Sequence, residues 1–215
     1  QQRILQKGER KIAIFSTPAF PFLMDSRLQH LSLCFLIHIF AGSSLQAQPR
    51  SGPMAPIHDQ PDLPRVLLVG DSISIGYTVP VREMLKGRAN VHRILENGGP
   101  SSKGIQKLDQ WLGKEKWDLI HFNWGLHDLK FMENNKRQVS LDDYEQNLTE
   151  IVDRLKQTGA SLIWASTTPV PHGNLKPLRK PGDDLIYNLV AKRIMRDKQV
   201  AVNDLFALAN SQLDQ

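Results

Sequence analysis

A serine follows a short apolar run, and it is the first residue in the chain placed as a catalytic group would be. The run RVLLVG, residues 65–70, stops at Gly70 and is followed by Asp71 and Ser72. A serine on a tight turn after a buried strand can present its hydroxyl to a cleft, with N–H groups of a helix start beside it, as a nucleophile requires. Taken alone, Gly-Asp-Ser is three common residues, and a helix cap or turn cap is then the simpler interpretation of Ser72.

Two other positions combine with this serine. Gly99 lies in ENGGPSS, residues 96–102, and His127 lies in GLHD, residues 125–128. A glycine allows close approach of its backbone N–H, and an imidazole can donate a ring N–H, so both are candidate donors to an oxyanion. Each alone is more simply a turn glycine or a loop histidine. Because all three follow successive predicted strands, together they favour a site.

The hydrophobic pattern alternates between strands and helices. Short apolar runs predict strands at residues 65–70, 90–97, 117–125, 160–170 and 199–206. Helical periodicity predicts helices at residues 79–87, 101–113, 140–159 and 182–198, with a further helical start at 207–215. This alternation predicts an α/β fold with a parallel sheet and helices on both faces. Ligands bind at the carboxyl ends of the strands in such sheets, which is where the candidate residues fall.

Three blocks of the sequence, VLLVGDSISIGY, ENGGPSS and FNWGLHD, resemble the first three blocks of the SGNH (GDSL) esterase and lipase superfamily in order and spacing. The resemblance covers residues 65 to about 210 and extends to carbohydrate-esterase-like members. It implies a three-layer α/β/α sandwich with a parallel, flavodoxin-like sheet of about five strands. It also implies that Ser72 is the nucleophile, that its N–H and that of Gly99 form the oxyanion hole, and that Asp71 holds the turn.

The chain departs from that family at two places. The third block usually reads G-x-N-D with the asparagine as an oxyanion donor, but here His127 stands in its place, followed by Asp128 as a supporting residue. The family's general base lies in a C-terminal D-x-x-H block, which this chain lacks, and His172 is not at that position. Three explanations stay open: a chain incomplete at its C-terminus, which we favour, a non-catalytic relative, or another histidine as the base. We expect little esterase activity from the chain as it stands.

The N-terminal part is expected to be processed. From Met24 to Ala47 the chain has a basic start, an apolar run and small residues, as in a secretory signal peptide. We therefore expect an upstream extension at 1–23, a signal peptide at 24–47 and a linker at 48–64, followed by the hydrolase-like domain at 65–215. The expected location is periplasmic or secreted, without stable membrane insertion after cleavage. A buried core helix is the alternative for the apolar run.

Composition restricts the possible partners. The net charge of +5 comes from lysines and arginines interleaved with acids, which does not favour nucleic-acid binding. The single cysteine excludes an internal disulfide, and no Cys/His cluster has zinc spacing, so no metal or organic cofactor is expected. Basic residues in the segment PHGNLKPLRKPGDD could border the cleft near an acidic substrate, although a solvated surface is the simpler interpretation. They are Lys176, Arg179 and Lys180.

The leading functional hypothesis is a serine ester hydrolase that works through an acyl-serine intermediate. Export and the G-x-H-D variant favour O-acetyl or similar esters of carbohydrate as substrates. A lysophospholipase or thioesterase of the same family is the alternative substrate class. A binding protein that kept the sheet and lost the base is the alternative from another class. A flavodoxin-like phosphate binder ranks last, because the sequence has neither a P-loop nor G-x-G-x-x-G.

Overall fold

The computed structural model describes residues 52–213. The expected extension at 1–23 and signal peptide at 24–47 lie outside the described residues. The described part of the expected linker is bound to the sheet by its hydrogen bonds. Asn90 accepts from the Gln60 N–H at 2.8 Å and donates to the Gln60 and Leu63 carbonyls. His92 pairs with Asp59 at 2.6 Å, so this segment is fixed along the strand that begins at Asn90.

Five parallel strands form one sheet in the order β2-β1-β3-β4-β5, which confirms the predicted sheet. The strands are β1 (Arg65–Val69), β2 (Asn90–Arg93), β3 (Leu119–Phe122), β4 (Ser161–Ala165) and β5 (Ala201–Asn203). The chain starts near the middle of the sheet, moves to one edge, and returns past β1 to the other edge. The change of direction therefore falls between β1 and β3, which is where such sheets bind ligands.

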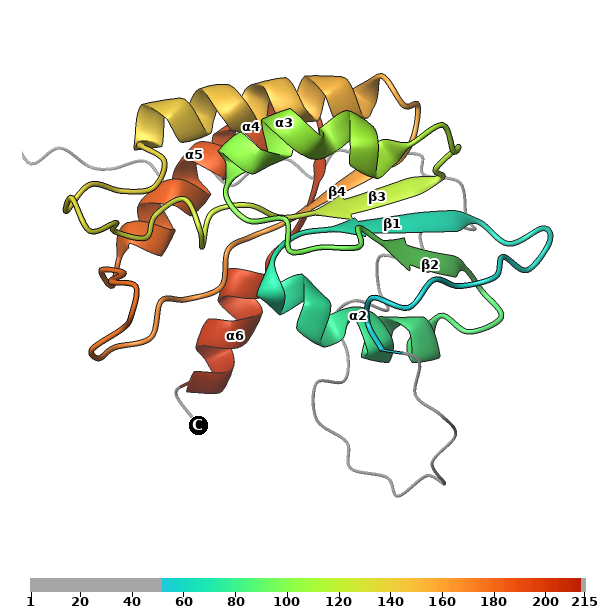
Figure 1. Ribbon diagram of the computed structural model, residues 1–215, viewed down its shortest axis with the longest axis horizontal. Helices are drawn as coiled ribbons and strands as arrows, with labels where there is room; N and C mark the ends of the chain where they lie inside the picture. The colour runs from blue at the N-terminus through green and yellow to red at the C-terminus, as the bar shows by residue number, and fades with distance from the viewer. Residues whose placement is uncertain (1–51, 214–215) are drawn as a thin grey trace, which may run out of the picture.

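Helices cover both faces of the sheet (Figure 1), which confirms the predicted three layers. The helices are α2 (Ser72–Met84), α3 (Ser101–Leu112), α4 (Leu141–Lys156), α5 (Asp183–Asp197) and α6 (Leu205–Leu213). Figure 1 shows α3, α4 and α5 together above the sheet, and α2 and α6 below it. Strand β3 is buried along its whole length, as expected for a strand covered on both faces.

The two faces of the sheet carry two separate hydrophobic cores. The larger core joins sheet residues such as Phe122 and Trp164 to Tyr144 and Leu148 of α4. The smaller core lies under α2. Its buried members are Val66, Leu68, Val81, Leu85, Ala89, Val91, Leu119 and Ile163. Alternate residues of β1 therefore enter different cores, which explains why its sequence is a continuous apolar run.

One predicted helix begins at the wrong place. The pattern predicts a helix at 79–87, but α2 begins at Ser72 and includes Pro80. Proline lacks an N–H and its ring meets the carbonyl four residues earlier, so it normally marks a helix start. Here Asp71 caps the helix, because its carboxylate accepts from the Ile73 N–H at 3.0 Å. The helix therefore passes through the proline that made it look like two segments.

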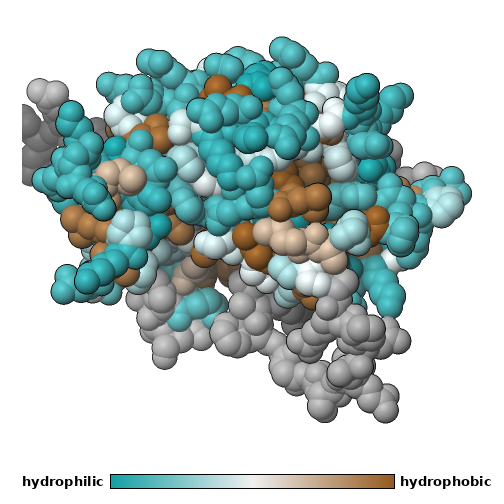
Figure 2. All heavy atoms as spheres, viewed as in Figure 1, coloured by the Kyte–Doolittle hydropathy of each residue, from teal (hydrophilic) through white to brown (hydrophobic). Residues whose placement is uncertain are grey.

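The remaining elements lie close to their predicted positions. Helix α4 is capped by Ser140, the first residue of its predicted range, with the Ser140 hydroxyl accepting from the Asp143 N–H at 3.1 Å. Strand β5 has three residues, shorter than predicted, and α6 starts at Leu205. None of the helices within 52–213 is long and apolar enough to cross a membrane. The face shown in Figure 2 is mainly hydrophilic, with small separate groups of hydrophobic atoms.

Two helical glycines allow a matched test of packing. A Cβ at Gly104 would lie 2.8 Å from the Trp124 ring and 2.9 Å from Ile151 Cδ1, whereas a Cβ at Gly76 would have nothing within 4 Å. Alanine is the better helix former at both sites by about 1 kcal/mol. We expect Gly76→Ala to stabilise the fold by up to that amount, and Gly104→Ala to destabilise it by about 1–3 kcal/mol through overpacking.

Urea unfolding followed by circular dichroism measures both variants. Equal shifts of the two midpoints in the same direction would contradict the close packing of α3 on Trp124.

Candidate active site

The predicted site residues meet at one edge of the sheet. Strand β1 ends just before Asp71 and Ser72, the loop after β2 contains Gly99, and the loop after β3 contains His127 and Asp128. Since all five strands are parallel, their carboxyl ends and these loops lie on the same edge. The structure therefore brings together the elements that carry the five predicted residues.

Ser72 is the first residue of α2, and its side chain is exposed. The helix cap is Asp71, so the simpler interpretation of Ser72 as a cap is wrong. Within residues 52–213 the Ser72 hydroxyl has no hydrogen-bond partner. The first N–H groups of a helix lack intrahelical acceptors and carry its positive end, so negative charge that forms beside Ser72 is favoured there.

The turn that presents Ser72 is fixed from below. Ser74 donates its hydroxyl to the Asp71 carbonyl at 2.8 Å and accepts from Nη2 of Arg93 at 2.8 Å. Arg93 is 4% exposed and also donates to the carbonyls of Ile94 and Glu96. Burial lowers the pKa of this guanidinium. Sequence reasoning missed Arg93, although an arginine inside a predicted buried strand was a signal that something polar lies beneath it.

Two loops touch backbone to backbone next to this turn. The Gly98 N–H donates to the Gly70 carbonyl at 2.9 Å, and a Cβ at Gly98 would lie 2.9 Å from that carbonyl oxygen. The loop after β2 therefore lies directly against the turn before Ser72. No side chain fits at Gly98 without moving one of the two backbones.

Gly99 is buried, with φ of +61°, a conformation that favours glycine. Its N–H, the predicted second oxyanion donor, donates to Oδ1 of Asn97 at 2.8 Å. To bind a substrate oxygen, this N–H must first give up its hydrogen bond to the Asn97 oxygen. The assignment of Gly99 to an oxyanion hole therefore stays a prediction, and it includes movement of the Asn97 side chain.

Asp128 connects the loop after β3 to α3. Its Oδ1 accepts from the Ser101 N–H at 2.8 Å, whereas Pro100, at the N-cap position, has no side-chain bond to offer. The carboxylate thus supplies both an acceptor and a negative charge to the start of α3. Asp128 is fully buried, and Oδ2 has no partner within residues 52–213. Burial raises the pKa of Asp128 to about 6, with the bonds from Ser101 acting against that rise.

His127 is half-buried, and charged side chains from several loops act on it. Burial lowers its pKa, the positive charges of Lys130, Arg179 and Lys103 lower it further, and the charge of Asp71 opposes them. The imidazole is therefore neutral at pH 7, with one nitrogen as a donor and the other as an acceptor. Since Asp128 bonds to Ser101, the carboxylate that follows His127 in sequence is committed to α3.

Gly125 fixes the path of the chain into this loop. Its φ is +146°, and a Cβ there would lie 2.2 Å from Oγ1 of Thr167. That hydroxyl donates to the Trp124 carbonyl at 3.1 Å, and the Thr167 backbone exchanges two hydrogen bonds with the Asn188 side chain, each 2.8 Å. Sequence reasoning missed Thr167 and Asn188, which hold the loop after β4 against the one after β3.

The other histidines occupy different environments. His121 lies within β3 and is fully buried near the Tyr77 hydroxyl, at 3.4 Å, and burial lowers its pKa to about 4. His92 is paired with Asp59, and His172 is exposed in the loop before α5. None of the histidines within 52–213 hydrogen-bonds Ser72. The same part of the chain contains no group of three His, Cys, Asp or Glu side chains that could hold a metal ion.

The buried carboxyl of Asp128 predicts a pH dependence of stability. Its pKa in the folded protein is about 6, above the ordinary aspartate value of about 3.9, so folding favours the protonated form. The stability from this group is fully present below about pH 4. It is lost as the pH rises through about 6. In Asp128→Asn, one amide oxygen can still accept from Ser101 and no charge is buried.

We expect the thermal midpoint of the Asp128→Asn variant to rise relative to that of the unchanged chain as the pH increases from about 4 to 6. Thermal unfolding followed by circular dichroism at several pH values measures this difference. Asp142→Asn, at an exposed position in the first turn of α4, is the control for the loss of one negative charge. A difference between the Asp128→Asn variant and the unchanged chain that stays constant across this range would contradict the raised pKa.

The fold is similar to that of known esterases. Family models and curated proteins give no match to this sequence. Among solved structures, the acetyl xylan esterase AlAXEase has a TM-score of 0.59 and 15% identity, covering 70% of this chain and 82% of its own. Axe2, an acetylxylan esterase from Geobacillus stearothermophilus, has a TM-score of 0.57 and 18% identity over 71% of this chain and 80% of its own.

A protein described as a GDSL-like lipase, from Parabacteroides merdae, has a TM-score of 0.61 and 11% identity, covering 70% of this chain and 81% of its own. At these identities the likeness concerns the fold. The chain has the fold of these acetyl xylan esterases and of the GDSL-like lipase, which confirms the fold that the resemblance of its three sequence blocks implied.

Proposed function

We propose that this chain is a serine ester hydrolase that acts through an acyl-serine intermediate, with O-acyl esters of carbohydrate, chiefly acetyl esters, as substrates. The observation that carries the proposal is the exposed hydroxyl of Ser72 at the start of α2, where Asp71 takes the cap. Similar folds in acetyl xylan esterases support the carbohydrate ester as the substrate class.

The chemistry begins with attack of Ser72 Oγ on the ester carbonyl carbon. The carbonyl oxygen gains negative charge, which the Ser72 N–H, the His127 ring N–H and the Gly99 N–H stabilise. The alcohol leaves with a proton, and water then hydrolyses the acyl-serine to release the acid and restore the hydroxyl. No histidine or carboxylate within residues 52–213 hydrogen-bonds the Ser72 hydroxyl, so the acceptor of its proton is not assigned to a described side chain.

A small cavity lies beside α2. Its volume is about 10 Å³, roughly the room for one water molecule. Ile73, Tyr77, Leu126, Thr167 and Leu205 are among its lining residues, whereas Ser72, Gly99 and His127 are not. The cavity therefore does not distinguish an acetyl ester from the lysophospholipase or thioesterase alternative, and the preference for acetyl esters rests on the similar folds.

The alternative from a different class is a binding protein that kept the sheet and lost the base. The lack of a hydrogen-bonded base at Ser72 in the described part of the chain favours it. The two functions differ in one measurable property, since a binding protein releases no acetate from an acetylated sugar.

The first test uses the full gene product and a series of acetyl, butyryl and octanoyl esters. We expect acetate release to exceed octanoate release, and Ser72→Ala to lower kcat by about 10³-fold or more. Ser102 is a half-buried serine inside α3, and the Ser102→Ala variant is the matched control. This variant should be as active as the unchanged enzyme. Hydrolysis that survives Ser72→Ala would exclude Ser72 as the nucleophile.

The second test separates an oxyanion donor from a base at His127. If the imidazole donates to the oxyanion, His127→Asn keeps substantial activity because an amide N–H can reach the same oxygen. His127→Ala then loses about 10²–10³-fold in kcat. If His127 instead takes the proton from Ser72, the asparagine and alanine variants are equally inactive. Equal loss in two folded variants would therefore overturn the donor assignment.

Export belongs to the same proposal. The basic start, apolar run and small residues of 24–47 support cleavage after about Ala47 in a bacterial export system. The intact mass of the exported protein measures the cleavage position. A mature protein that keeps residues 31–45 would indicate an anchor or a core helix in place of a signal peptide.

A further inference from the structure

Two positively charged side chains, Lys130 and Arg179, come from separate loops that meet at the active-site edge. The Phe131 N–H donates to the Leu178 carbonyl at 2.8 Å, which joins the loop after β3 to the loop before α5. Nε of Arg179 donates to the Leu126 carbonyl at 2.9 Å. These two bonds join the segments that carry Lys130 and Arg179 to each other and to the residue before His127.

The charges of these two side chains act on each other and on His127. Burial lowers the pKa of Lys130, and the charge of Arg179 lowers it further. Both charges also lower the pKa of His127. Each side chain is half-buried, so water screens their repulsion less than it would at a fully exposed surface.

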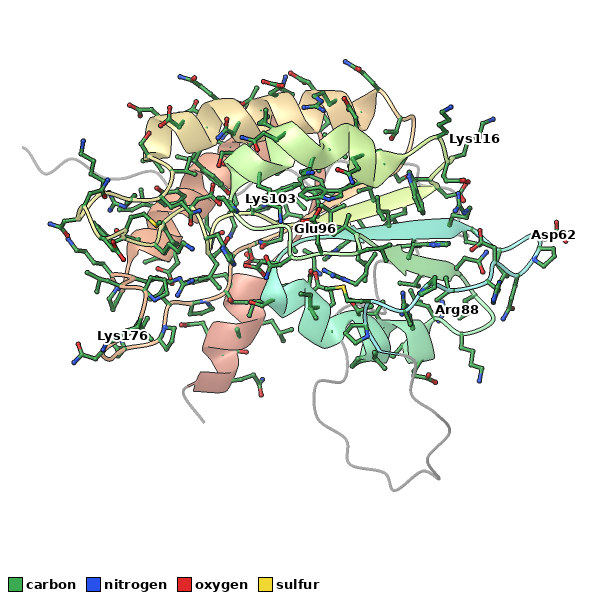
Figure 3. The ribbon with its side chains drawn as sticks, in the orientation of Figure 1. Asp62, Arg88, Glu96, Lys103, Lys116 and Lys176 are labelled. Atoms are coloured by element: carbon green, nitrogen blue, oxygen red, sulfur yellow. The ribbon has the colours of Figure 1, made fainter. Side chains whose placement is uncertain are left out.

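Neighbouring positive charges differ from this pair because they have partners. Lys103 forms an ion pair with Glu96 at 2.6 Å, and Figure 3 shows these two labelled side chains close together. Arg137 pairs with Asp183 at 2.7 Å. Lys180 lies over the Phe131 ring, 4.5 Å from its centroid.

Lys130 and Arg179 form no ion pair with any residue of 52–213. The charge of Asp128 acts on Lys130 and that of Asp71 acts on Arg179, but neither carboxylate forms an ion pair with them, since Asp71 caps α2 and Asp128 binds the start of α3. Holding two half-buried like charges together is unfavourable unless an anion offsets them. A guanidinium can bind both oxygens of a carboxylate, and an ammonium adds a compact positive charge beside it.

We propose that Lys130 and Arg179 bind a carboxylate of the substrate, so that the preferred substrates are esters of acidic sugars, such as an acetylated uronic acid. This inference rests on the proposed function, because it uses the ester at Ser72 to define where the sugar lies. The sugar carboxylate then sits between the two loops while the ester reaches Ser72.

The test compares acetylated methyl glucuronoside with acetylated methyl glucoside, which differ in the carboxylate. We expect the full gene product to prefer the glucuronoside ester in kcat/KM. Lys130→Gln should reduce that preference by about 10- to 100-fold, the usual range for a hydrogen bond to a charged group. Lys176→Gln is the matched control, because Lys176 is exposed in the loop before α5 that also carries Arg179 (Figure 3) and its replacement should keep the preference.

Arg179→Gln is the second variant. Because Arg179 also bonds to the Leu126 carbonyl, its replacement can shift the loop that carries His127 and slow both esters. The ratio of the two kcat/KM values separates charge recognition from such a shift. The proposal would be overturned if the unchanged enzyme showed no preference for the glucuronoside and the ratio of the two kcat/KM values stayed the same in the Lys130→Gln variant. The esterase function would remain intact.

A binding measurement separates failure of this proposal from failure of the proposed function. Titration calorimetry of the Ser72→Ala variant with methyl glucuronoside and methyl glucoside needs no hydrolysis. Selective binding of the glucuronoside, lost in the Ser72→Ala/Lys130→Gln double variant, supports the carboxylate site even if neither ester is cleaved. Equal or undetectable binding of both sugars, with hydrolysis of both esters at equal rates, counts against it.

Discussion

The site depends on one buried hydrogen bond, from the Ser101 N–H to the Asp128 carboxylate. It gives α3 the cap that Pro100 cannot supply, and it joins the loop after β2 to the loop after β3. Gly99 and His127 lie on opposite sides of this joint, so their relative position is set by it. Because the carboxyl is fully buried and its pKa is raised, the joint is held by a group whose ionisation opposes folding. At this edge of the sheet the buried carboxylate positions the oxyanion donors and, when ionised, lowers the stability of the fold.

Two glycines provide the second constraint on the same loops. Gly98 lies against the backbone of Gly70, and Gly125 lies against the side chain of Thr167, each too close for a Cβ. These contacts require no charge or titration, so they constrain the loops around Ser72 at any pH. The polar network of Arg93 and Ser74 then sets the height of the turn. Ser72 is therefore exposed while Ser74, two residues later, is buried and bonded to Arg93.

Sequence patterns predicted the fold well and the site in outline. Strands buried on both faces are continuous apolar runs, and amphipathic helices such as α4 have a clear period, so both are local signals. The start of α2 was missed because Pro80 is a local signal that the Asp71 cap overrides. Ser72, Gly99 and His127 were predicted from their places after strands; the structure brings their loops to one edge of the sheet, and their catalytic roles stay predictions. The partners of Arg93, Thr167 and Asn188 lie far along the chain, and the bond between Gly99 and Asn97 depends on a rotamer, so no sequence pattern could reveal which groups they bind.

Electrostatics show why net charge alone says little about this protein. The charge of +5 is spread along the chain, and most positive side chains near the site have a carboxylate or a ring as partner. Lys130 and Arg179 are the positive side chains near the site that have no such partner within residues 52–213. Burial lowers the pKa of His127 and these two charges lower it further, so a carboxylate bound between them would offset the contribution of the charges and raise the pKa of His127 toward its ordinary value. Since an imidazole with more positive character is the stronger donor to an oxyanion, binding of an acidic sugar would strengthen the donor beside it.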